Sequence, residues 1–317
     1  MSLYHNKTLY AISSDSVRYT WSFYYFLVFF SSVLGDFTIL VATIKYRAFK
    51  FPKFIVVIIQ HMAVCDIIIS LTSVIPMIIS LTANGWVLGD YLCYLTAYCS
   101  HYTSLTSVFL VCALTTSKLI ILKFPLQLWS SSTAHAHLLC SVLWIIALNV
   151  PFISIIDKSA ISFDYRVYLC NFTNSPTAWL SKTWLIPLLT VINIHIPILI
   201  VVSTTISLLI IARRVARRNW MHERLKWQGI MTAVFTAGFC CISFLPYTVF
   251  CTFTPLPTDS GLHFYRISWS LIFLQIVGNF YIYSVMVASF REFLWVRILQ
   301  RTFSEQKGYS PYYFLPF

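Results

Sequence analysis

Charge is what this sequence has least of, because Asp, Glu, Lys and Arg together make up only 10% of its 317 residues. Soluble domains are closer to a quarter charged, so these residues cannot cover the surface of a soluble protein of this size. Hydrophobic residues, in contrast, make up 58% of the chain. The composition therefore excludes an ordinary soluble domain and indicates a protein whose surface is largely in contact with lipid.

The sequence also has few glycines and no evident metal-binding motif. With eight glycines, packing of helices through small residues is limited, so aromatic side chains are expected to fill the space between helices. No internal repeat, low-complexity segment or cluster of metal ligands is visible, and His135 and His137 have no partner ligands in the sequence. Residues 1–20 lack the apolar run and cleavage site of a signal peptide, so the first apolar run is expected to direct its own insertion.

Seven apolar runs are long enough to cross a bilayer as helices, which takes about 20 residues each. They lie at 20–45, 54–82, 91–123, 135–156, 180–212, 226–253 and 264–289. Their connections are short, so we predict one all-α membrane domain, a seven-transmembrane helix bundle over residues 20–289. An N-terminal segment, 1–19, precedes it, and a short amphipathic eighth helix with a tail follows it over 290–317.

The basic residues predict the orientation of the bundle. Assigning the connections alternately to two sides places 16 of the 22 Lys and Arg residues on one side and 6 on the other. The basic side of a membrane protein is cytoplasmic, so the N-terminus is expected outside the cell, with the protein in the plasma membrane. The net charge of +12 is then explained by contact with anionic lipid, and nucleic acid is not expected as a partner.

Two of the nine cysteines, Cys93 and Cys170, lie at or beyond the outer boundary of the predicted helices. The extracellular space is oxidising, so we predict a disulfide bond between them. Cys99 lies about two helical turns deeper and is out of reach of such a bond. Asn6 and Asn171 each begin an Asn-x-Thr sequence on the same predicted side, which makes both candidate glycosylation sites.

Two carboxylates, Asp36 and Asp66, stand inside predicted membrane helices. A carboxylate in this environment costs several kcal/mol unless it is paired or neutralised, so it marks a functional site by default. Ser107 and Asn279 lie at depths at which they can face Asp66. Together these side chains are expected to hold a cation or a proton. The alternative is a hydrogen-bonded polar cluster that only orients the helices.

A series of short motifs follows the predicted helices in order. They are Gly35-Asp36, Met62-Ala63-Val64-Cys65-Asp66, Trp86-Val87-Leu88-Gly89 ahead of Cys93, Trp144, Cys170, Pro197, Ser243-Phe244-Leu245-Pro246, Asn279-Phe280-Tyr281-Ile282-Tyr283 and Phe290-Arg291-Glu292-Phe293. Over nearly the whole chain they resemble the motifs of rhodopsin-like G-protein-coupled receptors. The resemblance implies a receptor, not an enzyme, that binds an extracellular ligand and activates a heterotrimeric G protein. It also makes Asp66, Ser107 and Asn279 a sodium site, with Gln275 nearby, and implies no other cofactor.

The departures from the family fall on the residues that it uses as a switch. Ser117-Lys118-Leu119 stands where the family has Asp-Arg-Tyr, and Lys226 stands where a glutamate is common. Two cations cannot form an ion pair between helices, so signalling without ligand is expected. Phe244, Phe280 and Thr205 stand where the family has tryptophan, proline and tyrosine. The other residues assigned to the switch and the G-protein face are Arg213, Arg214, Arg217, Arg218, Pro246 and Tyr283.

The outer pocket predicted from the resemblance is neutral and aromatic. Ser100 replaces the aspartate of amine receptors, and Phe273 replaces the lysine that holds retinal. A monoamine or retinal is therefore not expected, whereas a small apolar molecule or a peptide end group suits such a pocket. The predicted pocket residues are Ser100, His101, Ser104, Asn193, Phe244, Tyr247, Cys251, Tyr265, Arg266 and Trp269, each of which could instead serve helix packing.

Two other functions stay open at this point. The altered switch also fits a divergent chemosensory or non-signalling seven-helix receptor. The two membrane carboxylates also fit an ion or proton transporter that uses Asp36 and Asp66 as its path. Transporters more typically show paired halves or interrupted helices, and neither is visible in the sequence.

Overall fold

The structure is a computed structural model that describes nine parts of the chain. These are residues 12, 14–46, 49, 51–123, 133–149, 161–172, 191–219, 224–253 and 259–299. Within them, the side chains of 172, 191, 215–219, 224–226, 250–253, 259–261 and 297–299 are not described.

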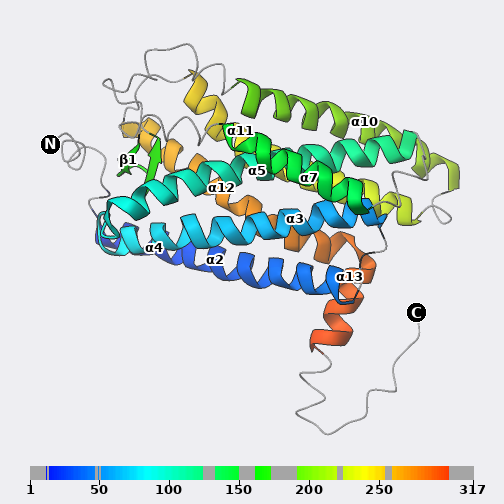
Figure 1. Cartoon of the computed structure of the whole chain (residues 1–317), viewed down its shortest axis with the longest axis horizontal. Coiled ribbons are helices and arrows are strands. Elements are labelled where there is room, and N and C mark those ends of the chain that lie inside the picture. The colour runs from blue at the N-terminus through cyan, green and yellow to red at the C-terminus, as the bar shows by residue number, and fades with distance from the viewer. Residues whose placement is uncertain are drawn as a thin grey trace, which may run out of the picture.

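Long helices packed side by side make up most of the described chain (Figure 1). In chain order they are α2 (Asp15–Ile44), α3 (Lys53–Ile69), η1 (Ser70–Val74), α4 (Ile75–Thr82), α5 (Gly89–Lys123), α7 (Thr133–Ala147), η4 (Val191–His195), α10 (Ile196–Asn219), α11 (Arg224–Phe253), α12 (Asp259–Met286), α13 (Ala288–Phe293) and η5 (Leu294–Leu299). A hairpin of β1 (Ile161–Asp164) and β2 (Leu169–Phe172) follows α7, with Ile161 opposite Phe172 and Asp164 opposite Leu169.

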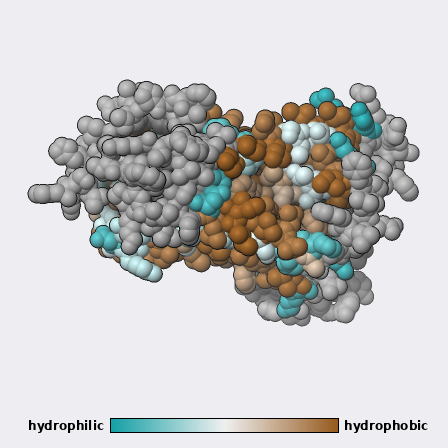
Figure 2. Space-filling view, turned by 45° about the horizontal axis from the view of Figure 1, so that its top comes forward, coloured by the Kyte–Doolittle hydropathy of each residue, from teal (hydrophilic) through white to brown (hydrophobic). Residues whose placement is uncertain are grey.

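Six helices in the described residues are long and apolar enough to cross a membrane. The apolar helix α7, with 15 described residues, is the seventh, so the predicted seven-helix bundle is confirmed. Large apolar side chains point outward, such as Phe37, Leu199 and Ile242, each more than 60% exposed. Figure 2 shows a mostly hydrophobic surface across the middle of one face, with hydrophilic residues mainly toward its ends. Such a surface suits contact with lipid.

Two proline positions explain where the helices widen into π-helical turns. Pro76 follows η1 and Pro197 follows η4. Proline lacks an N–H, and its ring clashes with the carbonyl four residues earlier, which here is at Thr72 and Asn193, inside the two π turns. The helix relieves each clash by taking one extra residue per turn. α11 continues through Pro246, and Pro151 lies outside the described residues.

The two ends of the bundle differ in character. Figure 1 places the hairpin and the start of α2 at one end, which we call the disulfide end. The opposite end, which we call the basic end, holds Lys118 near the end of α5 and the start of α13. Beyond α12, α13 and η5 turn away from the bundle (Figure 1). That they form an amphipathic eighth helix along the membrane stays a prediction.

Candidate functional site

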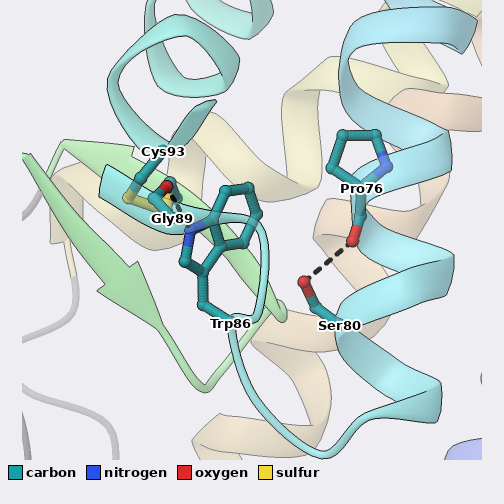
Figure 3. Close-up of a disulfide and its surroundings, with 6 residues drawn as sticks. Pro76, Ser80, Trp86, Gly89 and Cys93 are labelled. Atoms are coloured by element: carbon teal, nitrogen blue, oxygen red, sulfur yellow. Dashed lines mark hydrogen bonds between the residues drawn. A yellow bond between two sulfur atoms is a disulfide. The ribbon is translucent and has the colours of Figure 1, made fainter. Parts of the chain in front are cut away.

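A disulfide bond closes the disulfide end, as predicted. Cys93 in the first turns of α5 is bonded to Cys170 in β2, with their Cα atoms 5.2 Å apart and a sequence separation of 77. Figure 3 shows how the segment before α5 turns into the helix. The Trp86 indole donates to the carbonyl of Gly89 at 2.8 Å, and Gly89 has a φ of 82°, a conformation that favours glycine. The bond therefore ties the hairpin to the helix at the centre of the bundle.

The two membrane carboxylates lie in the middle of the bundle, where α2, α3 and α12 meet. Asp36 and Asp66 are completely buried and close enough to interact electrostatically. The Asn279 side-chain amide donates to Asp66 at 2.7 Å and joins α12 to α3. Ser32 donates to Asp36 at 2.9 Å, and Ser70 donates to Ser32 at 2.8 Å. Neither serine belongs to a motif, so the sequence did not point to them.

Each of the five side chains predicted for the sodium or proton site has one buried oxygen with no hydrogen-bond partner among the described residues. These oxygens are Asp36 Oδ1, Asp66 Oδ1, Ser107 Oγ, Gln275 Oε1 and Asn279 Oδ1. Buried polar atoms are nearly always hydrogen-bonded, so unsatisfied oxygens mark a place where a proton or a cation would be stabilised. Carboxylate, hydroxyl and amide oxygens suit hard cations. The five side chains predicted for the sodium or proton site therefore fit such an ion.

The structure distributes the predicted pocket residues over several places. Ser100 is hydrogen-bonded to Ser73 of η1 at 2.6 Å. His101 lies 2.6 Å from the side-chain oxygen of Asn171 in β2. The side-chain oxygen of Asn193 in η4 accepts a hydrogen bond of 2.9 Å from a side-chain amide just after α7. These polar side chains join neighbouring elements, a role that their positions in the sequence did not indicate.

The aromatic pocket residues, in contrast, gather near the disulfide end. The centre of the Tyr247 ring on α11 lies 5.8 Å from the ring centre of Tyr265 and 5.1 Å from that of Trp269, both on α12. Trp269 also contacts the ring of Phe273 at 6.0 Å. Of the other predicted pocket residues, the structure buries Phe244, half-buries Ser104 and does not describe the side chain of Cys251.

A cavity lies beside this aromatic group, between α2, α4, α12 and the turn of the hairpin. Its empty volume of about 250 Å³ is mostly open space at its mouth, and the enclosed part has room for about one water molecule. Arg266 and Trp269 are the two predicted pocket residues that line it, and Tyr25, Arg166 and Tyr168 form part of the other walls. The cavity therefore lies toward α2, to one side of the predicted pocket.

Lys118 lies buried at the basic end. Its amine is 4.0 Å from the centre of the Phe51 ring, which is the geometry of a cation–π interaction. Gly229 of α11 faces the same amine, because a Cβ added there would lie 3.1 Å from Nζ. Neither of the two ion pairs in the described part of the chain includes Lys118. The sequence suggested an unrestrained cation, but burial and the Phe51 ring hold it in place.

Phe51 also connects Lys118 to an aromatic cluster at the basic end. The ring of Phe49 lies 5.8 Å from Phe51, 5.5 Å from Tyr283 and 5.0 Å from Phe290. Tyr283, near the end of α12, is fully buried. Ring contacts therefore run from α5 through the segment between α2 and α3 to α12 and α13. Lys118 and Tyr283 are two of the residues that the sequence assigned to the switch.

On α10, the contact with α5 comes from Thr204 and not from Thr205, the residue that the sequence assigned to the switch. The Thr205 hydroxyl is bonded within α10, to the carbonyl of Val201 at 2.6 Å. Thr204 instead donates to Thr115 of α5 at 3.1 Å.

Of the other residues assigned to the switch and the G-protein face, Leu119 packs against a small apolar cluster of α10 and α11, and Ser117 is buried. Arg213 and Arg214 are exposed near the end of α10, and the side chains of Arg217, Arg218 and Lys226 are not described.

Gly35 and Phe280 form a tight contact between α2 and α12. A Cβ on Gly35 would lie 2.8 Å from the Phe280 Cβ and 2.7 Å from its Cγ. Carbon atoms pack at about 3.5–4.0 Å, so only glycine fits at position 35. α12 runs unbroken through Phe280, as expected where a helix has lost its proline.

Trp144 takes part in a hydrogen-bonded chain between α7 and α3. Its indole donates to His61 Nδ1 at 3.2 Å, and His61 Nε2 lies 3.2 Å from His137 Nδ1. Because Nδ1 of His61 accepts, the neutral ring carries its proton on Nε2 and donates it to His137. His137, which had no predicted partner, thus helps to hold the two helices together.

One glycosylation prediction is wrong in this fold. Asn171 is only 4% exposed, and its side-chain oxygen is the group bonded to His101. A glycan is bulky and needs an acceptor on the surface, so Asn171 is not available for one. Asn6 lies outside the described residues and stays a prediction.

Comparison with known proteins agrees with this geometry. The family model "7 transmembrane receptor (rhodopsin family)" matches residues 35–306. A QRFP-like peptide receptor of Branchiostoma floridae is 19% identical over 239 residues, which are 71% of this chain and 61% of that protein. Melatonin receptor type 1A of Phodopus sungorus is 22% identical over 188 residues, 59% of this chain and 51% of that receptor. The matches thus span half to three fifths of these relatives.

A solved structure has the same fold over the whole chain. Squid rhodopsin superposes with a TM-score of 0.78 at 15% identity, and the match covers 100% of this chain and 97% of that one. The seven helices, the disulfide bond and the match to residues 35–306 lead to one conclusion. This chain is a multi-pass membrane protein that belongs to the rhodopsin family of seven-transmembrane receptors.

Proposed function

We propose that this receptor lies in the plasma membrane with its disulfide end and N-terminus outside the cell. A ligand bound at that end would activate a heterotrimeric G protein at the basic end. The observation that carries the proposal is a set of polar and ring contacts that join the helices in the middle of the bundle and at its basic end. The Asn279–Asp66 hydrogen bond joins α12 to α3 in the middle, and ring contacts join Lys118 to α12 and α13 at the basic end.

The ligand is proposed to be a peptide or a small, largely apolar molecule. The names of two relatives, a peptide receptor and a melatonin receptor, support these two classes. A monoamine is not proposed, because Ser100, which is bonded to Ser73, offers it no negative charge. Retinal is not proposed either, because Phe273, in contact with Trp269, offers no amine to hold it. The aromatic group of α11 and α12 would contact the apolar part of the ligand.

The G-protein surface is proposed to include the end of α10, where Arg213 and Arg214 are exposed. When α5 moves relative to the segment between α2 and α3, Lys118 would leave the Phe51 ring. A buried cation–π interaction contributes roughly 2 kcal/mol, which lies within the usual size of an allosteric coupling, about 1–3 kcal/mol. The Lys118–Phe51 contact would thus partly replace the missing ion pair.

Direct complex formation tests this surface. We expect the purified receptor in nanodiscs to form a complex with at least one class of heterotrimeric G protein without nucleotide, as measured by size-exclusion chromatography. Replacing Arg213 and Arg214 by glutamate should weaken the complex about tenfold or more, because charge complementarity at an interface would be reversed. Lys45→Glu makes the same kind of change at an exposed residue directly after α2, at the same end, and should have little effect. Equal weakening by both variants would contradict the assignment.

We also propose that Asp36 and Asp66 share one proton or hold one sodium ion. Two carboxylates this close cannot both be ionised without a counter-ion at reasonable cost. Ser107, Gln275 and Asn279 would add neutral oxygens, and the ion would supply the positive charge that the pair lacks. Because these groups come from α2, α3, α5 and α12, an ion bound among them would stabilise one packing of the four helices.

A melting series checks this site. We expect sodium, compared with N-methylglucamine, to raise the melting temperature of the wild type, since a ligand that binds only the folded state stabilises it. Asp66→Asn should abolish the sodium effect. Asp36→Asn should fold and lose pH dependence between about pH 5 and 8, a range in which a coupled carboxylate pair can titrate. Asp90→Asn, at an exposed carboxylate, is the matched control. If the melting temperature of the wild type depends on neither sodium nor pH, the site is only a hydrogen-bonded polar cluster that orients the helices.

The buried carboxylate pair is also the observation that favours a transporter as the second candidate. Sodium and proton flux into liposomes separates the two functions, because a receptor should carry no flux above that of empty liposomes. Flux that disappears with Asp66→Asn would favour the transporter. A divergent receptor that does not signal would instead bind ligand but form no complex with any G protein.

A further inference from the structure

A chain of three side chains joins α7 to α3 in the half of the bundle nearer the basic end. The Trp144 indole of α7 donates to His61 Nδ1 of α3 at 3.2 Å, and His61 Nε2 lies 3.2 Å from His137 Nδ1 of α7. His61 lies about two turns from the start of α3, which follows Phe51 and its contact with Lys118 at the basic end. His61 and Trp144 are half-buried, whereas His137 is exposed. A proton from outside the bundle can therefore reach the chain at His137.

The hydrogen bonds of this chain determine where its protons lie. An indole N–H can only donate, so Nδ1 of His61 must be unprotonated, and the neutral ring carries its proton on Nε2. That proton points at Nδ1 of His137, which must be unprotonated in turn, so this ring also carries its proton on Nε2. The chain is therefore complete only when both imidazole rings are neutral.

A proton added to either ring disrupts the chain. In both histidines the nitrogen that can take up a proton is Nδ1. On His61 the new N–H would face the N–H of Trp144, and on His137 it would face the N–H of His61. If His61 moved its own proton to Nδ1 instead, that proton would again face Trp144. Each protonated form therefore loses one hydrogen bond and brings two donors together, and donors left without an acceptor inside a protein are costly.

The ionisable groups around the chain do not supply a counter-ion for a protonated ring. His61 interacts electrostatically with His137, and neither of the two ion pairs in the described part of the chain includes a histidine. The carboxylates of α2 and α3 interact with each other and with α12 instead. Residues 124–132, which precede α7, include no ionisable side chain.

The other titratable side chains near the three residues, apart from the exposed His135 of α7, are of types that are ordinarily neutral below about pH 8. They are Cys65 of α3, Tyr98 and Tyr102 of α5, and Cys140 of α7. Tyr102 packs its ring against Trp144 at 5.4 Å. The two histidines are therefore the groups of this chain that respond to a change in pH.

We propose that the Trp144–His61–His137 chain is a proton-binding site, at which acidification breaks the hydrogen bond between Trp144 and His61 and loosens α7 from α3. Histidine ordinarily takes up a proton between about pH 5 and 8, so a fall in pH within this range reaches the site. The folded chain favours the neutral rings, so its contacts are complete above this range and are lost as the pH falls. The inference needs neither a ligand nor a G protein, and it gives the receptor a second input, the proton concentration at its basic end.

The indole proton of Trp144 reports directly on this bond. The purified receptor in nanodiscs carries isotopically labelled tryptophan for NMR, and the spectrum of Trp144→Phe identifies the resonance of Trp144. Between about pH 8 and 5, we expect this resonance of the wild type to move to lower chemical shift, because a proton that loses its acceptor is more shielded. The Trp86 indole donates to the carbonyl of Gly89, which does not titrate, so its resonance should stay in place. This comparison within the wild type needs no further variant.

His61→Asn separates the histidine chain from the buried carboxylate pair. The carboxamide oxygen can accept from Trp144 in place of Nδ1, and the amide does not titrate, so the Trp144 resonance should no longer move with pH. The carboxylates still titrate in this variant, so any movement that they cause would remain. The same variant is the background in which the melting series of the carboxylate pair contains no contribution from the histidine chain.

His135→Asn, which changes an exposed histidine of α7, is the matched control. Its Trp144 resonance should titrate as in the wild type. A wild-type Trp144 resonance that does not move with pH, that moves together with the Trp86 resonance, or that moves equally in His61→Asn would overturn the proposal.

Discussion

Replacing either cysteine of the Cys93–Cys170 bond by alanine should remove most of the receptor from the cell surface. The bond closes a loop of 77 residues, and loss of a native disulfide typically costs about 2–5 kcal/mol. It also holds β2, with Asn171 and its hydrogen bond to His101, against α5. Flow cytometry of intact cells with an N-terminal epitope tag measures the surface fraction.

The double variant distinguishes a bond from two separate packing roles. Once one partner is gone the bond no longer exists, so Cys93→Ala with Cys170→Ala should be no worse than either single change. Cys99→Ala is the matched control, because Cys99 is a free, half-buried cysteine of the same helix. Losses that add in the double variant would contradict a shared bond.

Gly35→Ala should destabilise the receptor by about 1–3 kcal/mol, the usual cost of overpacking a core. The new methyl group would lie against the Cβ and Cγ of Phe280. These atoms adjoin the backbone of α12, so the side chain cannot rotate away, and the two helices have to separate. A clear fall in the melting temperature of the purified receptor is expected.

Gly238 of α11 provides the matched control for this change. A Cβ there would meet no atom within 4 Å, and alanine is favoured over glycine inside a helix by about 1 kcal/mol. Gly238→Ala should therefore leave the melting temperature unchanged or raise it. If Gly35→Ala behaved in the same way, the close packing of α2 on α12 would be wrong.

The parts of the fold that follow from local chemistry were predictable. Seven long apolar runs led to seven membrane helices because the bilayer sets a minimum length for each. Cys93 and Cys170 were predictable as a pair because they alone stood at the expected outer boundary. Asp36 and Asp66 could be recognised because a carboxylate stands out in an apolar helix.

The parts that depend on which side chains meet were not predictable. Ser32 and Ser70 are common helix residues, and only the packing of α2 on η1 shows that Ser70 donates to Ser32, which in turn donates to Asp36. Phe51 stands outside every motif, so its contact with Lys118 could not be foreseen. A glycosylation sequence says nothing about burial, which is why Asn171 was predicted wrongly. Ser100 and His101 were predicted as pocket residues from the resemblance, and their hydrogen bonds to neighbouring elements could not be foreseen, whereas their contact with a ligand stays a prediction.

Guanine-nucleotide exchange without added ligand tests the proposed signalling most directly. The receptor in nanodiscs is mixed with each class of heterotrimeric G protein, and uptake of a non-hydrolysable GTP analogue is followed over time. Because no acid among the described residues pairs with Lys118, at least one class should exchange faster than with empty nanodiscs. Lys226→Glu should reduce that rate by restoring an ion pair between α5 and α11. Rates equal to those of empty nanodiscs for every class, or a basal rate that Lys226→Glu leaves unchanged, would contradict it.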